Sequence, residues 1–108
     1  MPHYLFQGSY EPEALKAVMR NPQQRMEIAR KTAEKLGGKL EGLWFCFGEY
    51  DVVSITQFPD NVPAAALCAA VASGGAFRAG RTTVLISTAE FQEAGKRAEA
   101  CGYKPPSA

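Results

Sequence analysis

Apolar positions along the chain recur with two different periods, which predict helices and strands in alternation. Residues 12–36 carry apolar side chains at helical spacing, and Asn21-Pro22 divides this stretch into two helical pieces. Asp60 is a good N-cap for an alanine-rich helix that runs to about Ser73. Residues 89–101 predict a last helix. The chain therefore contains three separate helical regions, the first of them broken at a proline.

Strand-like runs, rich in β-branched and aromatic side chains, lie between the helical regions. They cover residues 3–9, 40–47, 50–58 and 81–87. The resulting order, β-α-β-β-α-β-α, is the ferredoxin-like arrangement. The sequence thus predicts an α+β fold with a four-stranded antiparallel sheet, helices on one face and an extra C-terminal helix. We expect one domain over residues 1–101 and a flexible tail over residues 102–108.

The short connection between the second and third runs predicts how these strands pair. Gly48-Glu49 fits a two-residue type II′ turn, which sets Phe45 opposite Val52. On this register Leu43, Phe45, Phe47 and Val52 share one face, which is too apolar to remain in water. Because the helices cover only the other face, the sequence predicts a homodimer whose sheet–sheet interface contains these four residues.

Composition and charge exclude several classes of function. The 108 residues are 46% hydrophobic and 21% charged, which is ordinary for a soluble domain. A net charge of +1 gives no long-range attraction to nucleic acid, and the third strand lacks the basic-aromatic octamer of RNA-binding domains. Three scattered cysteines and one histidine support neither a disulfide framework nor a metal site. Without a signal peptide or membrane span, we expect a cytoplasmic protein that needs no cofactor.

Several short segments in the same order resemble the GYD domain family. They are Tyr4-Leu5 with Gly8-Ser9-Tyr10, Leu36-Gly37-Gly38-Lys39, Gly48-Glu49-Tyr50-Asp51-Val52-Val53, Phe58-Pro59-Asp60 and Arg81-Thr82-Thr83. The resemblance covers most of residues 2–91 and implies a dimeric α+β barrel, but it implies no assigned activity. Arg81, which precedes Thr82, fits the family position better than Arg78 does.

Catalytic candidates are few. Tyr50 and Asp51 point to opposite faces on the predicted register, so they do not form a pair. Asp51 is a candidate acid, base or anchor in the cleft between helices and sheet, and His3 is a candidate acid–base group. For Asp51 the sequence favours a structural role, which is a bond to an arginine or a backbone amide at the end of its strand. For His3 it favours a solvated residue without a catalytic role.

Ligand-binding candidates are the two isolated arginines and two aromatic residues. Arg78 and Arg81 could hold an anionic group through the guanidinium fork, although the sequence favours their pairing with Glu49 and Asp51 within the fold or across the dimer. Trp44 and Tyr4 could line an apolar pocket. The interpretation we favour is a dimeric module that binds a small organic, possibly anionic, molecule between sheet and helices. The alternatives are a cofactor-independent monooxygenase, decarboxylase or isomerase, and a purely structural or interaction module.

Overall fold

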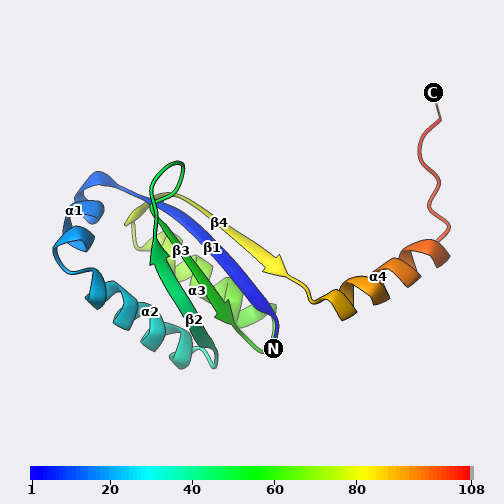
Figure 1. The fold of residues 1–108 in the computed structure, drawn as a ribbon, viewed down its shortest axis with the longest axis horizontal. Helices are drawn as coiled ribbons and strands as arrows, with labels where there is room; N and C mark the ends of the chain where they lie inside the picture. The colour runs from blue at the N-terminus through cyan, green and yellow to red at the C-terminus, as the bar shows by residue number, and fades with distance from the viewer. Residues whose placement is uncertain (108) are drawn as a thin grey trace.

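The computed structural model describes residues 1–107, which form one antiparallel sheet and four helices (Figure 1). In chain order the elements are β1 (His3–Tyr10), α1 (Pro12–Arg20), α2 (Pro22–Lys35), β2 (Lys39–Phe45), β3 (Val52–Gln57), α3 (Asn61–Ser73), β4 (Phe77–Leu85) and α4 (Thr88–Ala100). The strands lie in the order β2-β3-β1-β4. The predicted ferredoxin-like α+β fold is therefore confirmed, with the first helical region split into two helices. Residue 108, the end of the predicted tail, lies outside the described residues.

Side-chain caps fix where the helices begin. The Asn21 side chain accepts a hydrogen bond from the backbone N–H of Gln24 at 3.3 Å, and Pro22 occupies the first turn of α2. Asp60 accepts from the N–H of Val62 at 3.0 Å and so starts α3. The break near Pro22 and the cap at Asp60 were both predicted from the sequence, and both are confirmed.

The register of the β2–β3 hairpin is also confirmed, although its turn is not. Leu43 lies opposite Ser54 and Phe45 opposite Val52, as predicted. The ladder ends there, however, and residues 46–51 form a longer loop in place of a two-residue turn. In this loop the N–H of Cys46 still donates to the carbonyl of Asp51 at 2.8 Å. The pairing survives because the strands are held by their ladder rather than by the turn.

Strand β4 begins four residues earlier than the sequence predicted. Residues 77–80 read as a loop because Ala79 and Gly80 have low β propensity. In the structure Ala79 pairs with Ser9 of β1 and Gly80 pairs with Gly8, and the register shifts between Ser9 and Tyr10. Pairing with an already formed central strand thus overrides local propensity.

The helices cover the face of the sheet that was predicted to be open. Val52, only 2% exposed, clusters with Tyr10 and with Val18 of α1, and Leu43 packs against the same cluster. Phe45 lies on this same face, since residues two apart in a strand point the same way. Phe47 lies in the hairpin loop and is 100% exposed. The assignment to an open sheet–sheet interface is therefore wrong for Val52 and Leu43, which pack against the helix-covered cluster, and Phe47 lies outside the sheet.

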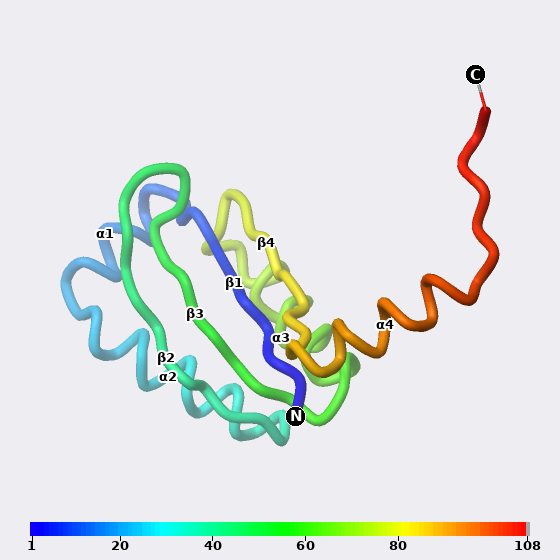
Figure 2. Tube along the Cα trace, turned by 45° about the vertical axis from the view of Figure 1, so that its right-hand side comes forward, coloured from blue at the N-terminus to red at the C-terminus, as the bar shows by residue number. Residues whose placement is uncertain are grey.

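The opposite face of the sheet is uncovered. Trp44 lies on it and is 54% exposed, next to partly exposed Val53, Ile55 and Leu5 on the neighbouring strands. Helix α4 does not cover this face. It projects away from the sheet together with the C-terminal segment, and all its residues are exposed (Figures 1 and 2). The chain thus presents an apolar sheet face and an unpacked helix to the solvent.

Candidate functional site

A cavity of about 130 Å³ lies between the sheet and helices α2 and α3. Helix α2 packs over β2 and α3 over β4, so the cavity lies over the central strands. The helices contribute Arg25, Ile28, Ala29 and Thr32 from α2, and Ala64, Leu67, Cys68 and Val71 from α3. Both sets follow an i, i+3, i+4, i+7 spacing, which places each set on one helix face.

Aromatic rings form most of the cavity wall. The rings of Tyr10 and Phe77 stack with centroids 4.4 Å apart, and Phe6 meets Phe77 edge-on at 5.3 Å. At the other end, Tyr4 and Phe58 are tilted against each other at 5.9 Å. Gly8 makes room for the first group, since a Cβ there would lie 2.6 Å from the Phe77 ring. Stacked and edge-on or tilted geometries are the ones that aromatic pairs prefer. The rings at the two ends define a flat, apolar space.

Two hydroxyls, one from a serine and one from a threonine, interrupt this apolar wall. Ser54 and Thr56 alternate with outward-facing residues on β3, and they are 9% and 7% exposed. Both line the cavity. Neither hydroxyl oxygen is fully buried and unbonded, since no such side-chain atom occurs among residues 1–107, so both oxygens open onto the cavity; the hydroxyl of Thr82, which also lines the cavity, lies 3.1 Å from the sulfur of Cys68. Buried hydroxyls usually find partners, so these two are available to a molecule in the cavity.

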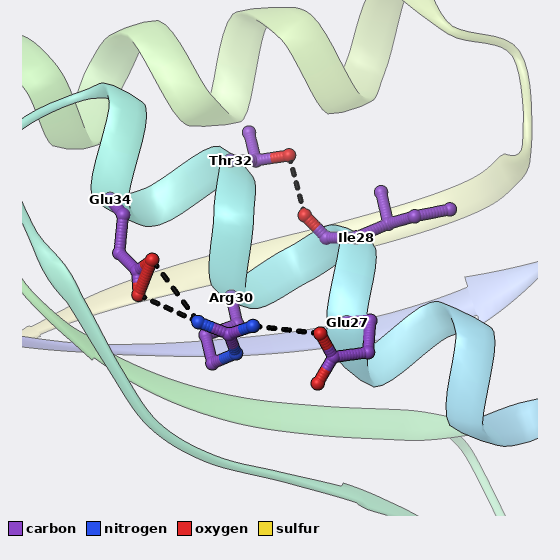
Figure 3. A network of polar contacts seen from close by, with 5 residues as sticks. All are labelled: Glu27, Ile28, Arg30, Thr32 and Glu34. Carbon is purple, nitrogen blue, oxygen red and sulfur yellow. Dashed lines mark hydrogen bonds and ion pairs between the residues drawn. The ribbon is translucent and has the colours of Figure 1, made fainter.

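Arg25 is the only charged side chain among the lining residues. It is partly buried, and within residues 1–107 it forms no ion pair with an acidic side chain. Arg30 on the same helix differs, since it donates to Glu27 at 2.7 Å and to Glu34 at 3.0 Å (Figure 3). A half-buried guanidinium that borders an apolar cavity without a carboxylate is suited to hold an anion.

Tyr10 lies beside this cation. Burial raises the pKa of Tyr10 above its usual 10.0, the nearby charge of Arg25 opposes that rise, and Asp51 adds to it. The Tyr10 hydroxyl is therefore neutral at ordinary pH and able to donate a hydrogen bond. Arg25 and Tyr10 together form a cationic, donor-rich end of the cavity.

Of the ligand-binding residues proposed from sequence, only Tyr4 lines the cavity. Its hydroxyl donates to Asn61 at 2.8 Å. Trp44 and Arg81 belong to one row across the open face, in which Val53 and Gln7 separate them. Arg78 is exposed on β4. The structure therefore does not bring the two arginines and the tryptophan to the cavity.

The candidate catalytic residues also lie apart. Asp51 accepts a hydrogen bond from the backbone N–H of Tyr10 at 2.9 Å, which is the structural role that the sequence favoured. The carbonyl of Tyr50 accepts from the thiol of Cys46 at 3.3 Å, and the Tyr50 side chain does not line the cavity. His3 lies at the far end of β1, where its Nε2 is 3.1 Å from Glu41. These residues do not converge on one site.

Sequence reasoning missed the cavity arginine and the two hydroxyls. Arg25 lies four residues before Ala29, on the apolar stripe of α2, and a cation at such a position is a usable signal. Ser54 and Thr56 carry a weaker signal, because polar residues that alternate with Val53 and Ile55 read as a solvated face. The polar positions are in fact the ones that face the helices.

Further features of residues 1–107 limit the chemistry. No three histidine, cysteine or acidic side chains in this part of the chain converge in the way a bound metal ion would require. Each helix in it is too short or too polar to cross a membrane. The site is thus built from one cation, several hydroxyls and aromatic rings.

Comparison with known proteins identifies the family. The family model of the GYD domain matches residues 4–94, which include all of the sheet except His3 and the cavity-lining parts of α2 and α3. A search of curated proteins finds no match. Because the matched region covers most of the 108 residues, the chain belongs to the GYD domain family.

Proposed function

We propose that the protein binds a small organic anion in the cavity between the sheet and helices α2 and α3. The observation that carries this proposal is Arg25, an arginine without an ion-pair partner among residues 1–107 that borders an otherwise uncharged cavity. A carboxylate matches the guanidinium fork, and the neutral Tyr10 hydroxyl supplies a further donor. The apolar part of the ligand would fill the space between the aromatic rings.

The energetics of an empty cavity support a ligand. The space of about 130 Å³ is lined almost entirely by apolar side chains, so an apolar group placed in it gains burial and packing contacts. The hydroxyls of Ser54 and Thr56 open onto the same space and offer hydrogen bonds to a molecule that fills it. A ligand that fills the space and bonds these groups gains both contributions.

Titration calorimetry with small carboxylates and their primary amides tests the proposal. We expect carboxylates to bind and the matching amides to bind at least tenfold more weakly. Arg25→Gln should weaken carboxylate binding about 10–100-fold, since a hydrogen bond to a charged group contributes about 1.5–3 kcal/mol. Lys31→Gln removes one exposed cation from the same helix and should leave affinity unchanged. Equal affinity of Arg25→Gln and the unchanged protein would contradict the proposal.

We also propose that the protein is a homodimer, now through the open face of the sheet. Trp44, Val53, Ile55 and Leu5 form an apolar surface there, which supports burial against a second copy. A cytoplasmic location remains part of the proposal. It is supported by Cys46, Cys68 and Cys101, which are all free thiols.

Binding without turnover is better supported than catalysis. An enzyme of this kind needs two or three polar side chains that converge in one apolar pocket. Asp51, His3 and Arg81 do not line the cavity, whereas the groups that do line it are hydroxyls and one arginine. Such groups are suited to hold a ligand, and none of them is a strong base at neutral pH.

A further inference from the structure

We infer that the ligand is a single-ring aromatic carboxylate that carries a second, uncharged polar group. This inference rests on the proposed function and adds to it the size, shape and polarity of the molecule. It depends on three observations of the cavity: its volume, its aromatic walls and the positions of its polar groups.

The volume admits one ring. A cavity of about 150 Å³ lined by apolar side chains holds one benzene molecule in another protein, and the cavity here is about 130 Å³. A fused two-ring acid exceeds this volume, so part of it would extend out of the open side of the cavity and away from the aromatic rings. The volume therefore matches one ring with small substituents.

The walls favour a flat ring over a flexible chain. The stacked rings of Tyr10 and Phe77 and the tilted pair of Tyr4 and Phe58 lie at the two ends of the cavity. An aromatic ligand meets these rings by stacking or edge-on contact, which adds to simple burial of apolar area. A linear chain of similar volume gains only the burial, and it also loses rotational freedom on binding.

The polar groups lie in order along the cavity. On the helix-covered face, Gly8 pairs with Val52, Phe6 with Ser54 and Tyr4 with Thr56. Tyr10 continues β1 beyond Gly8, so Arg25, whose charge acts on Tyr10, lies toward this end.

The hydroxyls of Ser54 and Thr56 follow toward the other end, on residues about 6.6–6.8 Å apart along the strand. A carboxylate at Arg25 therefore leaves the opposite side of the ring near these hydroxyls.

The two hydroxyls provide selectivity. A buried polar group that the ligand leaves unpaired discriminates strongly against that ligand. Ser54 and Thr56 are 9% and 7% exposed, and what remains accessible of their hydroxyls opens onto the cavity, so a ligand in it covers them. A hydroxyl or carbonyl on the far side of the ring would bond to them, and an unsubstituted ring would not.

Calorimetric titration of the full-length protein with four probes tests the inference. The probes are 4-hydroxybenzoate, benzoate, hexanoate and 6-hydroxy-2-naphthoate. We expect 4-hydroxybenzoate to bind most tightly, benzoate about 5–10-fold more weakly for lack of one buried hydrogen bond, and the other two at least about tenfold more weakly. The double variant Ser54→Ala, Thr56→Val should bind the two benzoates with equal affinity.

The outcomes separate this inference from the proposed function. If hexanoate or the naphthoate binds as tightly as 4-hydroxybenzoate, and Arg25→Gln still weakens binding, the single-ring class is wrong and the anion site stands. If benzoate equals 4-hydroxybenzoate in the unchanged protein, the second polar group is wrong. If none of the carboxylates binds, both proposals fail. The four probes are compared on the unchanged protein, so they test the ligand class even if the double variant does not fold.

Discussion

Asp51 shows how one side chain holds the end of the hairpin in place. Its carboxylate accepts the backbone N–H of Tyr10 at 2.9 Å, and its own N–H donates to the carbonyl of Gly8 at 2.8 Å. Nearby, the Ser9 hydroxyl donates to the carbonyl of Glu49 at 2.7 Å. The hairpin loop is thus bonded to the last residues of β1, next to the cationic end of the cavity.

Removal of this carboxylate should destabilise the fold. Asp51→Ala leaves the amide of buried Tyr10 without its acceptor, which should lower the free energy of unfolding by about 1–3 kcal/mol. Asp51→Asn keeps an acceptor oxygen and should lose less. Urea denaturation of both variants measures the difference. If both variants were as stable as the unchanged protein, the hydrogen bond between the Asp51 carboxylate and the Tyr10 amide would have no structural role.

Tyr10 makes a prediction about pH. Its pKa is raised mainly by burial, so the folded state holds this proton more tightly than the unfolded state does. The corresponding stability is fully present below pH 10 and is lost as the pH rises through the folded pKa. In a tyrosinate absorbance titration, one of the four tyrosines should ionise late, and Tyr10→Phe should remove that late step.

Arg25→Gln provides an internal check on this titration. The substitution removes the positive charge that counteracts the effect of burial, so the pKa of Tyr10 should increase further. An unchanged late step in this variant would mean that the two side chains do not interact.

The strands show which parts of the fold the sequence could predict. The register was predictable because Gly48-Glu49 lies at the centre of the connection, so counting outward from it sets Phe45 opposite Val52 even though the loop is longer than two residues. The covered face was not, because both faces of β3 contain β-branched side chains. Val53 and Ile55 are the more apolar pair, yet Ser54 and Thr56 lie under the helices. Local patterns fail here because polar groups occupy core positions at the candidate site.

Helix α4 makes a prediction about local stability. Ser87 and Glu90 form a capping box, with bonds of 2.9 and 3.1 Å, and these bonds lower the pKa of Glu90. Yet isolated helices shorter than about 12–15 residues are marginal in water. Amide exchange in α4 should therefore be at least about 100-fold faster than in α3. The comparison is matched, because both helices have 13 residues and α3 alone buries a side chain, Ala64. Equal protection would mean that α4 packs against another molecule.

At the scale of the whole molecule, the open face makes the sheet two-sided. The helix-covered face contains the cavity, and the other presents Trp44 and its apolar neighbours to the solvent. The sequence could predict that one face of the sheet stays bare, because the helices lie on one side only. Which residues lie on the bare face required the structure, since that depends on where α2 and α3 pack.

Charge placed on the open face should disrupt the proposed dimer. Ile55→Glu buries an unpaired carboxylate in the proposed interface, so the variant should be monomeric in light scattering at micromolar concentration. Phe47→Glu changes a fully exposed loop residue and is the matched control, which should stay dimeric. A dimeric Ile55→Glu protein, or a monomeric unchanged protein, would exclude this interface.

The strand order also has a consequence for solubility. β2 and β4 form the two edges of the sheet, where unpaired backbone groups invite another chain to add a strand. Glu41 lies at an irregularity in β2, and β4 carries Arg78 and Arg81, neither of which forms an ion pair within residues 1–107. Charges at such positions act as gatekeepers against aggregation. We therefore expect the two arginines that first suggested a ligand site to have a simpler role, which is to keep an exposed edge strand from templating fibres.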